Sequence, residues 1–339
     1  MEKMKGTSLQ ILILSLWVGF TSVAFAQTPV ESYVRPNSLK VGDTVAIVAP
    51  AGILKNRQAS IQQATTVLSS WGLHVVLGKH LYARDNHFAG TDEQRAEDFQ
   101  RAMDDTSVKA IWCARGGYGT MRILDMLDYA NFKKNPKWII GFSDITAIHG
   151  KLHQLCIQSV HGMMPTGVEG QKVQSESTIE NLESLKKVLF GEALEYQIPS
   201  SSFNRTGKVS GELIGGNLSL LQACLQSDAT LDTKDKILFI EEIGEYRYSI
   251  DRMLFSLKRA GYFKELKGLI IGDISRIKVN TTPFGKSNEE IVLNVVKEYD
   301  FPVLFDFPAG HEENNRALIL GREATLEVGE KESTLTFKN

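Results

Sequence analysis

Between Val45 and Leu155 the chain alternates short apolar runs with amphipathic segments, and this alternation constrains its fold more than any other feature. The apolar runs, which have the length and composition of buried strands, are residues 44–49, 74–77, 108–114 and 138–142. The amphipathic segments, which have helical spacing, are residues 57–71, 91–104 and 143–155. Strands and helices that alternate at this pace predict an α/β domain with a parallel, doubly wound sheet, in which ligands bind beyond the carboxyl ends of the strands.

The second half of the chain has a different composition. Residues 196–208 contain the runs Pro199-Ser200-Ser201-Ser202 and Asn204-Arg205-Thr206-Gly207, which predict a linker. The strand-like runs beyond it are residues 236–241, 268–274, 302–307, 317–320, 324–328 and 333–337, with one helix expected near residues 249–260. We therefore predict an N-terminal domain over residues 27–195 and a smaller, β-rich C-terminal domain over residues 209–339.

Residues 1–26 have the organisation of a secretory signal peptide. A short basic start with Lys3 and Lys5 precedes an apolar run, which ends in an Ala-Phe-Ala pattern of the kind that signal peptidase accepts. We therefore predict cleavage near Ala26–Gln27 and export to the periplasm, with no stable membrane span left after cleavage. The alternative is an uncleaved N-terminal anchor, for which the apolar run is short.

Composition and charge exclude several classes of protein. With 42% hydrophobic and 23% charged residues, the chain is neither disordered, nor collagen-like, nor a multi-span membrane protein. Lys and Arg total 38 against 40 Asp and Glu, without a block of like charges, so nucleic acid is not an expected partner. Three cysteines without a CxxC spacing indicate neither a disulfide framework nor a zinc site.

His149 and His153 lie four residues apart on one predicted helix, a spacing at which two imidazoles can bind zinc. No acidic residue lies between them as in the H-E-x-x-H motif, so we expect a pair on the helix surface. The sequence therefore predicts neither a metal nor a cofactor.

Ser143 follows an apolar strand directly and precedes a helix, so its hydroxyl is expected on a sharp turn at the edge of the sheet. This is the arrangement of a nucleophile elbow, although Gly141-Phe142-Ser143-Asp144 lacks the second glycine of G-x-S-x-G. Backbone N–H groups at a helix N-terminus can also stabilise a developing oxyanion. The alternative is that Ser143 only caps the helix.

A glycine-rich segment, residues 115–119, follows the preceding strand with the sequence Arg-Gly-Gly-Tyr-Gly. It could bind a phosphate, although it matches neither a P-loop nor G-x-G-x-x-G. Its backbone N–H groups could equally face an oxyanion or a substrate carboxylate, and a plain tight turn is the third possibility.

Two further candidates follow apolar strands in the second half. Glu241 and Glu242 come directly after residues 237–240, and His311 follows residues 307–310. Together with Ser143 they give the chain order Ser, Glu, His, which α/β hydrolases also use. A serine hydroxyl needs a base to take its proton, imidazole suits that task near neutral pH, and a carboxylate orients the imidazole.

The chain resembles the LD-carboxypeptidases, also called muramoyltetrapeptide carboxypeptidases, together with the related microcin C self-immunity peptidases. The segments that carry the resemblance are residues 45–52, 115–119, 141–144, 215–217, 241–245, 250–254 and 310–311. Each segment is short, but their order and spacing make the set specific.

The resemblance implies a serine peptidase with a Rossmann-like N-terminal domain and a smaller β-rich C-terminal domain, which share one Ser-Glu-His triad. The residues that match the family's site are the nucleophile Ser143, the general base His311, the acid Glu241 (Glu242 is less favoured) and the oxyanion-hole amides of Gly117 and Asp144. It also implies a homodimer and, as substrate, a peptidoglycan stem tetrapeptide that is cut before its terminal D-Ala. Arg115 is our candidate for binding the free substrate carboxylate, because a guanidinium can do so with two hydrogen bonds; a salt bridge within the glycine turn is the alternative.

Two features depart from the family pattern. Many members act in the cytoplasm, whereas the predicted export signal favours trimming of stem peptides in the periplasm. Met163 and Met164 precede Pro165, where the family often has Pro directly after the His-Gly pair, here His161-Gly162.

Other interpretations are a serine peptidase for peptidyl-adenylate substrates and a non-catalytic muropeptide-binding protein. The missing fingerprint glycines disfavour a nucleotide-binding enzyme.

Overall fold

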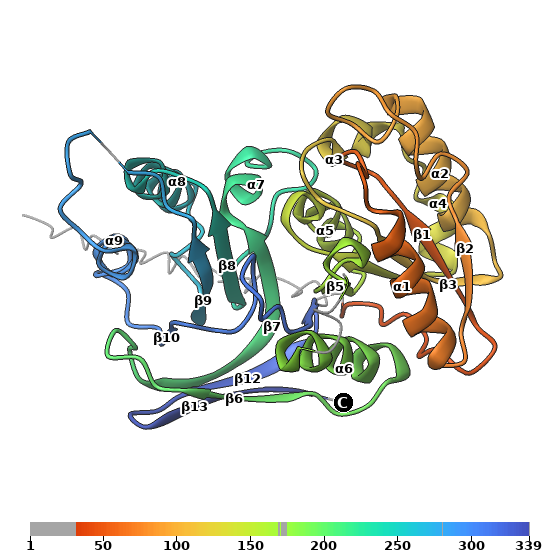
Figure 1. The fold of residues 1–339 in the computed structure, drawn as a ribbon. Coiled ribbons are helices and arrows are strands. Elements are labelled where there is room, and N and C mark those ends of the chain that lie inside the picture. The colour runs from red at the N-terminus through yellow and green to blue at the C-terminus, as the bar shows by residue number, and fades with distance from the viewer. Residues whose placement is uncertain (1–31, 169, 171–174, 280, 339) are drawn as a thin grey trace, which may run out of the picture. The chain divides into compact units, whose positions relative to one another are not determined.

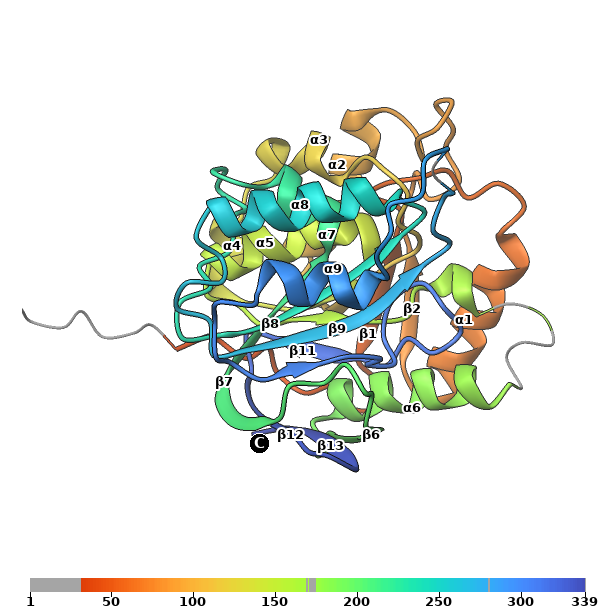
Figure 2. The same cartoon turned by 90° about the vertical axis from the view of Figure 1, so that its left-hand side faces the viewer.

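The structure, a computed structural model, describes residues 32–168, 170, 175–279 and 281–338, and the chain from Ser32 onward forms one compact unit. The predicted signal peptide, residues 1–26, lies outside the described residues. The described chain contains two sheets, each of which is covered by helices (Figure 1 and Figure 2).

The first sheet has six strands in the order β11-β5-β4-β3-β1-β2. Its five parallel strands are β1 (Thr44–Val48), β2 (His74–Leu77), β3 (Val108–Cys113), β4 (Trp138–Gly141) and β5 (Ser159–His161). The sixth strand, β11 (Leu318–Leu320), comes from the C-terminal part of the chain and pairs antiparallel with β5. The parallel sheet predicted from the alternation of apolar runs is confirmed.

Helices cover both faces of the first sheet, because its central strands are apolar on both sides. In β1, Val45 and Ile47 belong to the hydrophobic cluster that includes α1 and α6, whereas Ala46 and Val48 belong to the cluster that includes α2 and α5. The helices of this half are α1 (Gln58–Ser70), α2 (Asp92–Asp104), α3 (Thr120–Ile123), α4 (Ala130–Lys134), α5 (Thr146–Gln154) and α6 (Glu176–Phe190), with the 3-10 helices η1 (Leu124–Met126), η2 (Ser143–Ile145) and η3 (Pro165–Gly167).

The second sheet has seven strands in the order β10-β9-β8-β7-β12-β13-β6. Its four parallel strands are β7 (Gly207–Asn217), β8 (Ile237–Ile243), β9 (Gly268–Ser275) and β10 (Val303–Leu304). Its three antiparallel strands are β12 (Glu323–Val328), β13 (Glu332–Phe337) and β6 (Glu195–Pro199).

The parallel strands of the second sheet are joined by three helices, α7 (Leu218–Ala223), α8 (Arg247–Arg259) and α9 (Asn288–Val295), which pack on one face of the sheet (Figure 1). The sequence predicted only α8. The other two helices have 6 and 8 residues, which is too short for helical periodicity to stand out beside neighbouring strands.

The chain crosses between the two sheets more than once. β6 lies at the start of the segment predicted as a linker, and it pairs with β13 at the edge of the second sheet. β11 returns to the first sheet beside β5. Both sheets contribute to one hydrophobic cluster, which α6 shares. The loop between β10 and β11, which carries His311, is thereby brought back to the sheet that carries Ser143.

Candidate active site

Ser143 lies on a sharp turn at the carboxyl end of β4. Its φ angle is +62°, in the left-handed region that non-glycine residues rarely occupy, and Ser143 is the first residue of η2, which α5 follows at once. The Ser143 hydroxyl caps neither helix and makes no hydrogen bond to another residue of the described chain. A strained backbone that presents an unpartnered hydroxyl is typical of a nucleophile elbow rather than of a helix cap.

His311 and Glu241 form a hydrogen-bonded pair. Nδ1 of His311 lies 2.7 Å from Oε2 of Glu241, at the carboxyl end of β8. The Glu241 side chain is fully buried, and its second oxygen, Oε1, has no partner among the described residues. A buried carboxylate on Nδ1 orients the imidazole and leaves Nε2 as the ring nitrogen that can take a proton.

Phe142 connects this pair to the serine turn. Its ring packs edge-on against the His311 ring, with the two centroids 4.9 Å apart, and Phe142 directly precedes Ser143. The contact brings the His–Glu pair of the second half to the turn of the first sheet. No hydrogen bond joins Ser143 and His311 in the part of the chain that the structure describes.

Glu242, the less favoured candidate for the acid, has other partners. Its carboxylate accepts hydrogen bonds from Asn217 Nδ2 at 3.2 Å and from the backbone N–H of Ser219 at 2.8 Å. It also accepts the Ser219 hydroxyl and the backbone N–H of Ile243. Burial raises the pKa of the Glu242 carboxyl in spite of these hydrogen bonds. Glu242 therefore anchors the start of α7, whereas Glu241 is the carboxylate on His311.

The glycine-rich segment after β3 lies directly against the serine turn. A Cβ atom on Gly116 would lie 3.0 Å from Cβ and 3.2 Å from Oγ of Ser143. The Gly116 carbonyl accepts a hydrogen bond from the backbone N–H of Gly52 at 3.0 Å, and Gly117 has a φ of +106°. Glycine is thus favoured at 116 by the close approach to Ser143 and at 117 by the backbone conformation.

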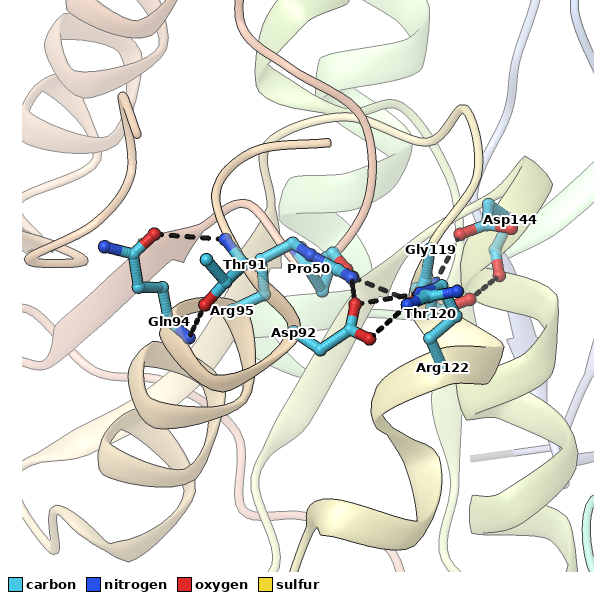
Figure 3. Close-up of polar contacts among 9 residues, drawn as sticks. All are labelled: Pro50, Thr91, Asp92, Gln94, Arg95, Gly119, Thr120, Arg122 and Asp144. Carbon is cyan, nitrogen blue, oxygen red and sulfur yellow. Dashed lines mark hydrogen bonds and ion pairs between the residues drawn. The ribbon is translucent and has the colours of Figure 1, made fainter. Parts of the chain in front are cut away.

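Asp144 links the serine turn to the end of the glycine-rich segment (Figure 3). Its carboxylate accepts the backbone N–H of Thr120 at 2.8 Å, and its carbonyl accepts the Thr120 hydroxyl at 2.5 Å. Burial raises the pKa of the Asp144 carboxyl. A Cβ on Gly116 would lie 3.5 Å from the backbone nitrogen of Asp144. Gly116 therefore lies beside both the Ser143 side chain and the Asp144 nitrogen, and the role of the Gly117 and Asp144 amides as an oxyanion hole stays a prediction.

The guanidinium of Arg115 donates a hydrogen bond to the carbonyl of Ile53. Among the described residues it forms no salt bridge within the glycine turn, which was the alternative. Its side chain lies against the turn that contains Gly52, since a Cβ on Gly52 would lie 3.8 Å from the guanidinium carbon. Burial, followed by the nearby charge of Arg57, lowers the pKa of Arg115. One backbone carbonyl leaves most of the guanidinium's five N–H donors for another ligand.

A cavity of about 390 Å³ opens beside His311, within the size range of small-molecule sites. Polar side chains on its wall include Thr178, Asn181 and Arg276. Its wall also includes Phe142, Met163, Gly310 and His311.

His149 and His153 are buried, which corrects one prediction. His149 donates to the Gly141 carbonyl at 2.9 Å, and His153 contacts the Tyr33 hydroxyl and accepts the backbone N–H of Asp232. Burial lowers the pKa of each to about 4. The prediction of a helix-surface pair is wrong, because α5 packs between the first sheet and the loop that follows α7.

The described residues contain no group of three or more His, Cys, Asp or Glu side chains that could hold a metal ion. Within the same ranges, no helix has the length and apolar character needed to cross a membrane.

Two family models together match most of the chain. The model for the LD-carboxypeptidase N-terminal domain matches residues 45–162, and the model for the LD-carboxypeptidase C-terminal domain matches residues 210–326. The chain belongs to the LD-carboxypeptidase family. The resemblance inferred from the short motifs is therefore confirmed, and Ser143, Glu241 and His311 all lie within the matched residues.

Individual members of the LD-carboxypeptidase family align over most of the chain. A probable murein peptide carboxypeptidase of Bacillus subtilis (strain 168) is 33% identical, and the alignment covers 89% of this chain and 94% of that protein. The crystal structure of muramoyltetrapeptide carboxypeptidase from Oxalobacter formigenes has a TM-score of 0.78 at 28% identity, covering 87% of this chain and 99% of that one. The microcin C7 self-immunity protein shares the fold, with a TM-score of 0.78 at 23% identity over 89% of this chain and 98% of that one.

Sequence reasoning missed two residues of this candidate site. Phe142 is the last residue of a predicted apolar run, but in the structure it also packs against His311 beside Ser143. Arg95 was not singled out, although it is 1% exposed and contacts the glycine-rich segment. The available signal was weak, because an arginine on an amphipathic helix normally lies on the solvated face.

Proposed function

We propose that the protein is an exported serine carboxypeptidase that cleaves the L,D peptide bond before the terminal D-Ala of peptidoglycan stem tetrapeptides. The observation that carries this proposal is the Glu241–His311 pair, which Phe142 holds against the strained turn of Ser143. Membership of the LD-carboxypeptidase family and the name of the Oxalobacter formigenes protein support this class of substrate.

In this mechanism His311 takes the proton of the Ser143 hydroxyl through Nε2, while Glu241 stabilises the imidazolium. Ser143 attacks the carbonyl carbon of the scissile bond, and the backbone N–H groups of Gly117 and Asp144 bind the oxyanion. His311 returns the proton to the nitrogen of D-Ala, which leaves. Water, activated by the same imidazole, then hydrolyses the acyl-enzyme.

The test is a release assay with the mature protein and a disaccharide-tetrapeptide. Free D-Ala and the tripeptide product are followed by mass spectrometry, for the parent protein and for a Ser143→Ala variant of equal thermal stability. The proposal requires release by the parent and none above background by the variant. Release that persists in the folded variant would assign the chemistry to another nucleophile.

A second candidate is hydrolysis of peptidyl-adenylate substrates of the microcin type, which the fold likeness to the microcin C7 self-immunity protein favours. The same catalytic residues would serve both reactions, so profiling both substrates with the one protein separates them. A protein that binds the muropeptide but releases nothing from either substrate would be a muropeptide-binding protein.

Export and assembly complete the proposal. We propose cleavage near Ala26–Gln27 and a periplasmic location on the basic, apolar and small-residue regions of residues 1–26. N-terminal sequencing of the protein from a periplasmic fraction tests this location. A homodimer is proposed from the family resemblance, and light scattering on the mature chain measures its mass in solution.

A further inference from the structure

Arg95 is a buried cation in the second turn of α2, and it contacts the end of the glycine-rich segment. Its Nη1 atom donates to the Pro50 carbonyl at 2.6 Å and to the Gly119 carbonyl at 2.8 Å, and its Nη2 atom contacts the carboxylate of Asp92 (Figure 3). Asp92 also binds Arg122, with nitrogen–oxygen distances of 2.9 and 2.6 Å. One guanidinium therefore contacts two backbone carbonyls and one carboxylate at once.

The two carbonyls belong to different loops that contact each other. Pro50 follows β1, Gly119 ends the glycine-rich segment after β3, and β1 and β3 are neighbours in the sheet. The same loops are joined a second time by the hydrogen bond from Gly52 N–H to the Gly116 carbonyl. Arg95 thus ties together the carboxyl ends of two adjacent strands at the place where Gly116 contacts Ser143.

The end of the glycine-rich segment is held from two sides. A Cβ on Gly119 would lie 2.7 Å from Arg95 Nη1, and Gly119 has a φ of +144°, so glycine is needed for this approach. On the other side, the Asp144 carboxylate binds the backbone N–H of Thr120 (Figure 3). The segment that contains Gly117 is therefore held between Arg95 and the residue that follows Ser143.

Stability alone is a poor explanation for a buried guanidinium. Removing a cation from water costs several kcal/mol, and an ion pair in the interior frequently recovers no more than a well-packed apolar pair would. Two of the hydrogen bonds of Arg95 are made to loop carbonyls, where they orient the backbone. Arg101, on the same helix, is exposed and forms an ion pair with Glu97, as is usual for an arginine on a helix surface.

We propose that Arg95 is a positioning residue that holds the glycine-rich segment so that the Gly117 amide points at the oxyanion formed when Ser143 attacks. This inference rests on the proposed function. A guanidinium suits the task because its planar fork has donors for both carbonyls and for Asp92 in one fixed geometry. A lysine ammonium at this position would donate hydrogen bonds to only some of these three acceptors.

The experiment compares Arg95→Met, Arg95→Lys and the matched control Arg101→Met in the mature protein. We measure kcat and KM for D-Ala release, the rate of covalent labelling of Ser143 by a fluorophosphonate, and the urea midpoint of each variant. We expect Arg95→Met to lower kcat and the labelling rate by about 10²-fold to 10³-fold, the loss typical of one oxyanion donor, with KM changed by less than about threefold. Arg95→Lys should recover part of the loss, and Arg101→Met should match the parent protein.

A folded Arg95→Met variant with the kcat of the parent would overturn the inference. If Arg95→Met fails to fold, the test uses Arg95→Lys instead. Parental kcat and labelling rate in Arg95→Lys would show that the planar guanidinium is not needed, which would overturn the inference. A parent protein that neither releases D-Ala nor reacts with the fluorophosphonate would overturn the proposed function as well. Parental activity with no effect in the Arg95 variants would overturn this inference alone.

Discussion

At the scale of single residues, the backbone conformation of Ser143 favours the proposed catalytic role over that of a helix cap. A φ of +62° costs a non-glycine residue about 1 kcal/mol or more, and the surrounding structure must supply that energy. The hydroxyl gains no hydrogen bond within the described chain that would repay the cost. Strain that gains nothing in the folded state is best explained by a need to present the side chain to a substrate.

Replacing Ser143 tests this strain directly. Ser143→Gly and Ser143→Ala should both abolish D-Ala release, but only glycine removes the backbone strain. We expect the glycine variant to be more stable than the alanine variant by about 1 kcal/mol in its free energy of unfolding, measured by urea denaturation. Equal stability of the two variants would mean that the turn relaxes and is not strained.

The two neighbouring glutamates provide a matched pair of substitutions. Glu241→Gln removes the charge beside His311 and should lower kcat at least about 10²-fold with little change in KM. Glu242→Gln places an amide among several donors and should lower the free energy of unfolding by about 1–3 kcal/mol, with a much smaller effect on kcat in the folded fraction. If Glu242→Gln instead lowered kcat and Glu241→Gln lowered only the free energy of unfolding, Glu242 would be the carboxylate that acts with His311.

At the scale of elements, the site is built at the carboxyl ends of three parallel strands. The turn of Ser143 follows β4, the glycine-rich segment follows β3, and Glu241 lies near the end of β8 in the other sheet. Parallel strands deliver the loops at their carboxyl ends to one edge, which is why the first two segments meet. The contact between them is close, so a Cβ atom at position 116 would displace Ser143 by a few tenths of an ångström.

Gly116→Ala should therefore impair the site without unfolding the protein. Its Cβ would push against Ser143 by a few tenths of an ångström, and small displacements of reacting groups are costly in rate. We expect kcat for D-Ala release to fall about tenfold or more. Gly162→Ala is the control, because its Cβ would make an ordinary contact of 3.5 Å with Ala317. Unchanged kcat in Gly116→Ala would show that the two segments move apart freely.

At the scale of the whole molecule, strand exchange between the two sheets assembles the site. β11 belongs to the C-terminal part of the chain but completes the first sheet, and β6 is the first strand of the second sheet in sequence but pairs at its edge with β13. His311 comes from the loop that leads back from β10 to β11. The position of His311 therefore depends on the pairing of β11 with β5, not only on local sequence.

Dividing the chain at the predicted linker tests this dependence. Residues 27–208 expressed alone should aggregate or unfold at low urea concentration, because β5 and β6 would lose the strands that cover their edges. Co-expression with residues 209–339 should restore a soluble complex that releases D-Ala. The intact protein should unfold in one transition, followed by far-UV circular dichroism. A stable 27–208 fragment with the urea midpoint of the intact chain would contradict this expectation.

The sequence by itself determined the parallel sheet, the family and the candidate residues. Apolar runs that are buried on both faces, and turns that need glycine or a hydroxyl, leave local signals in the chain, as β4 and the Ser143 turn do. The short helices α7 and α9 were missed because 6 and 8 residues carry too little periodicity.

Only the tertiary structure decided which glutamate meets His311, that α5 buries His149 and His153, and that Arg95 lies under the glycine-rich segment. Glu241 and Glu242 are adjacent, so their flanking sequence does not distinguish them. Their side chains point to opposite faces of β8, and the tertiary fold places His311 on one face and Ser219 on the other. Contacts between residues far apart in sequence are set by packing, and no local pattern records them.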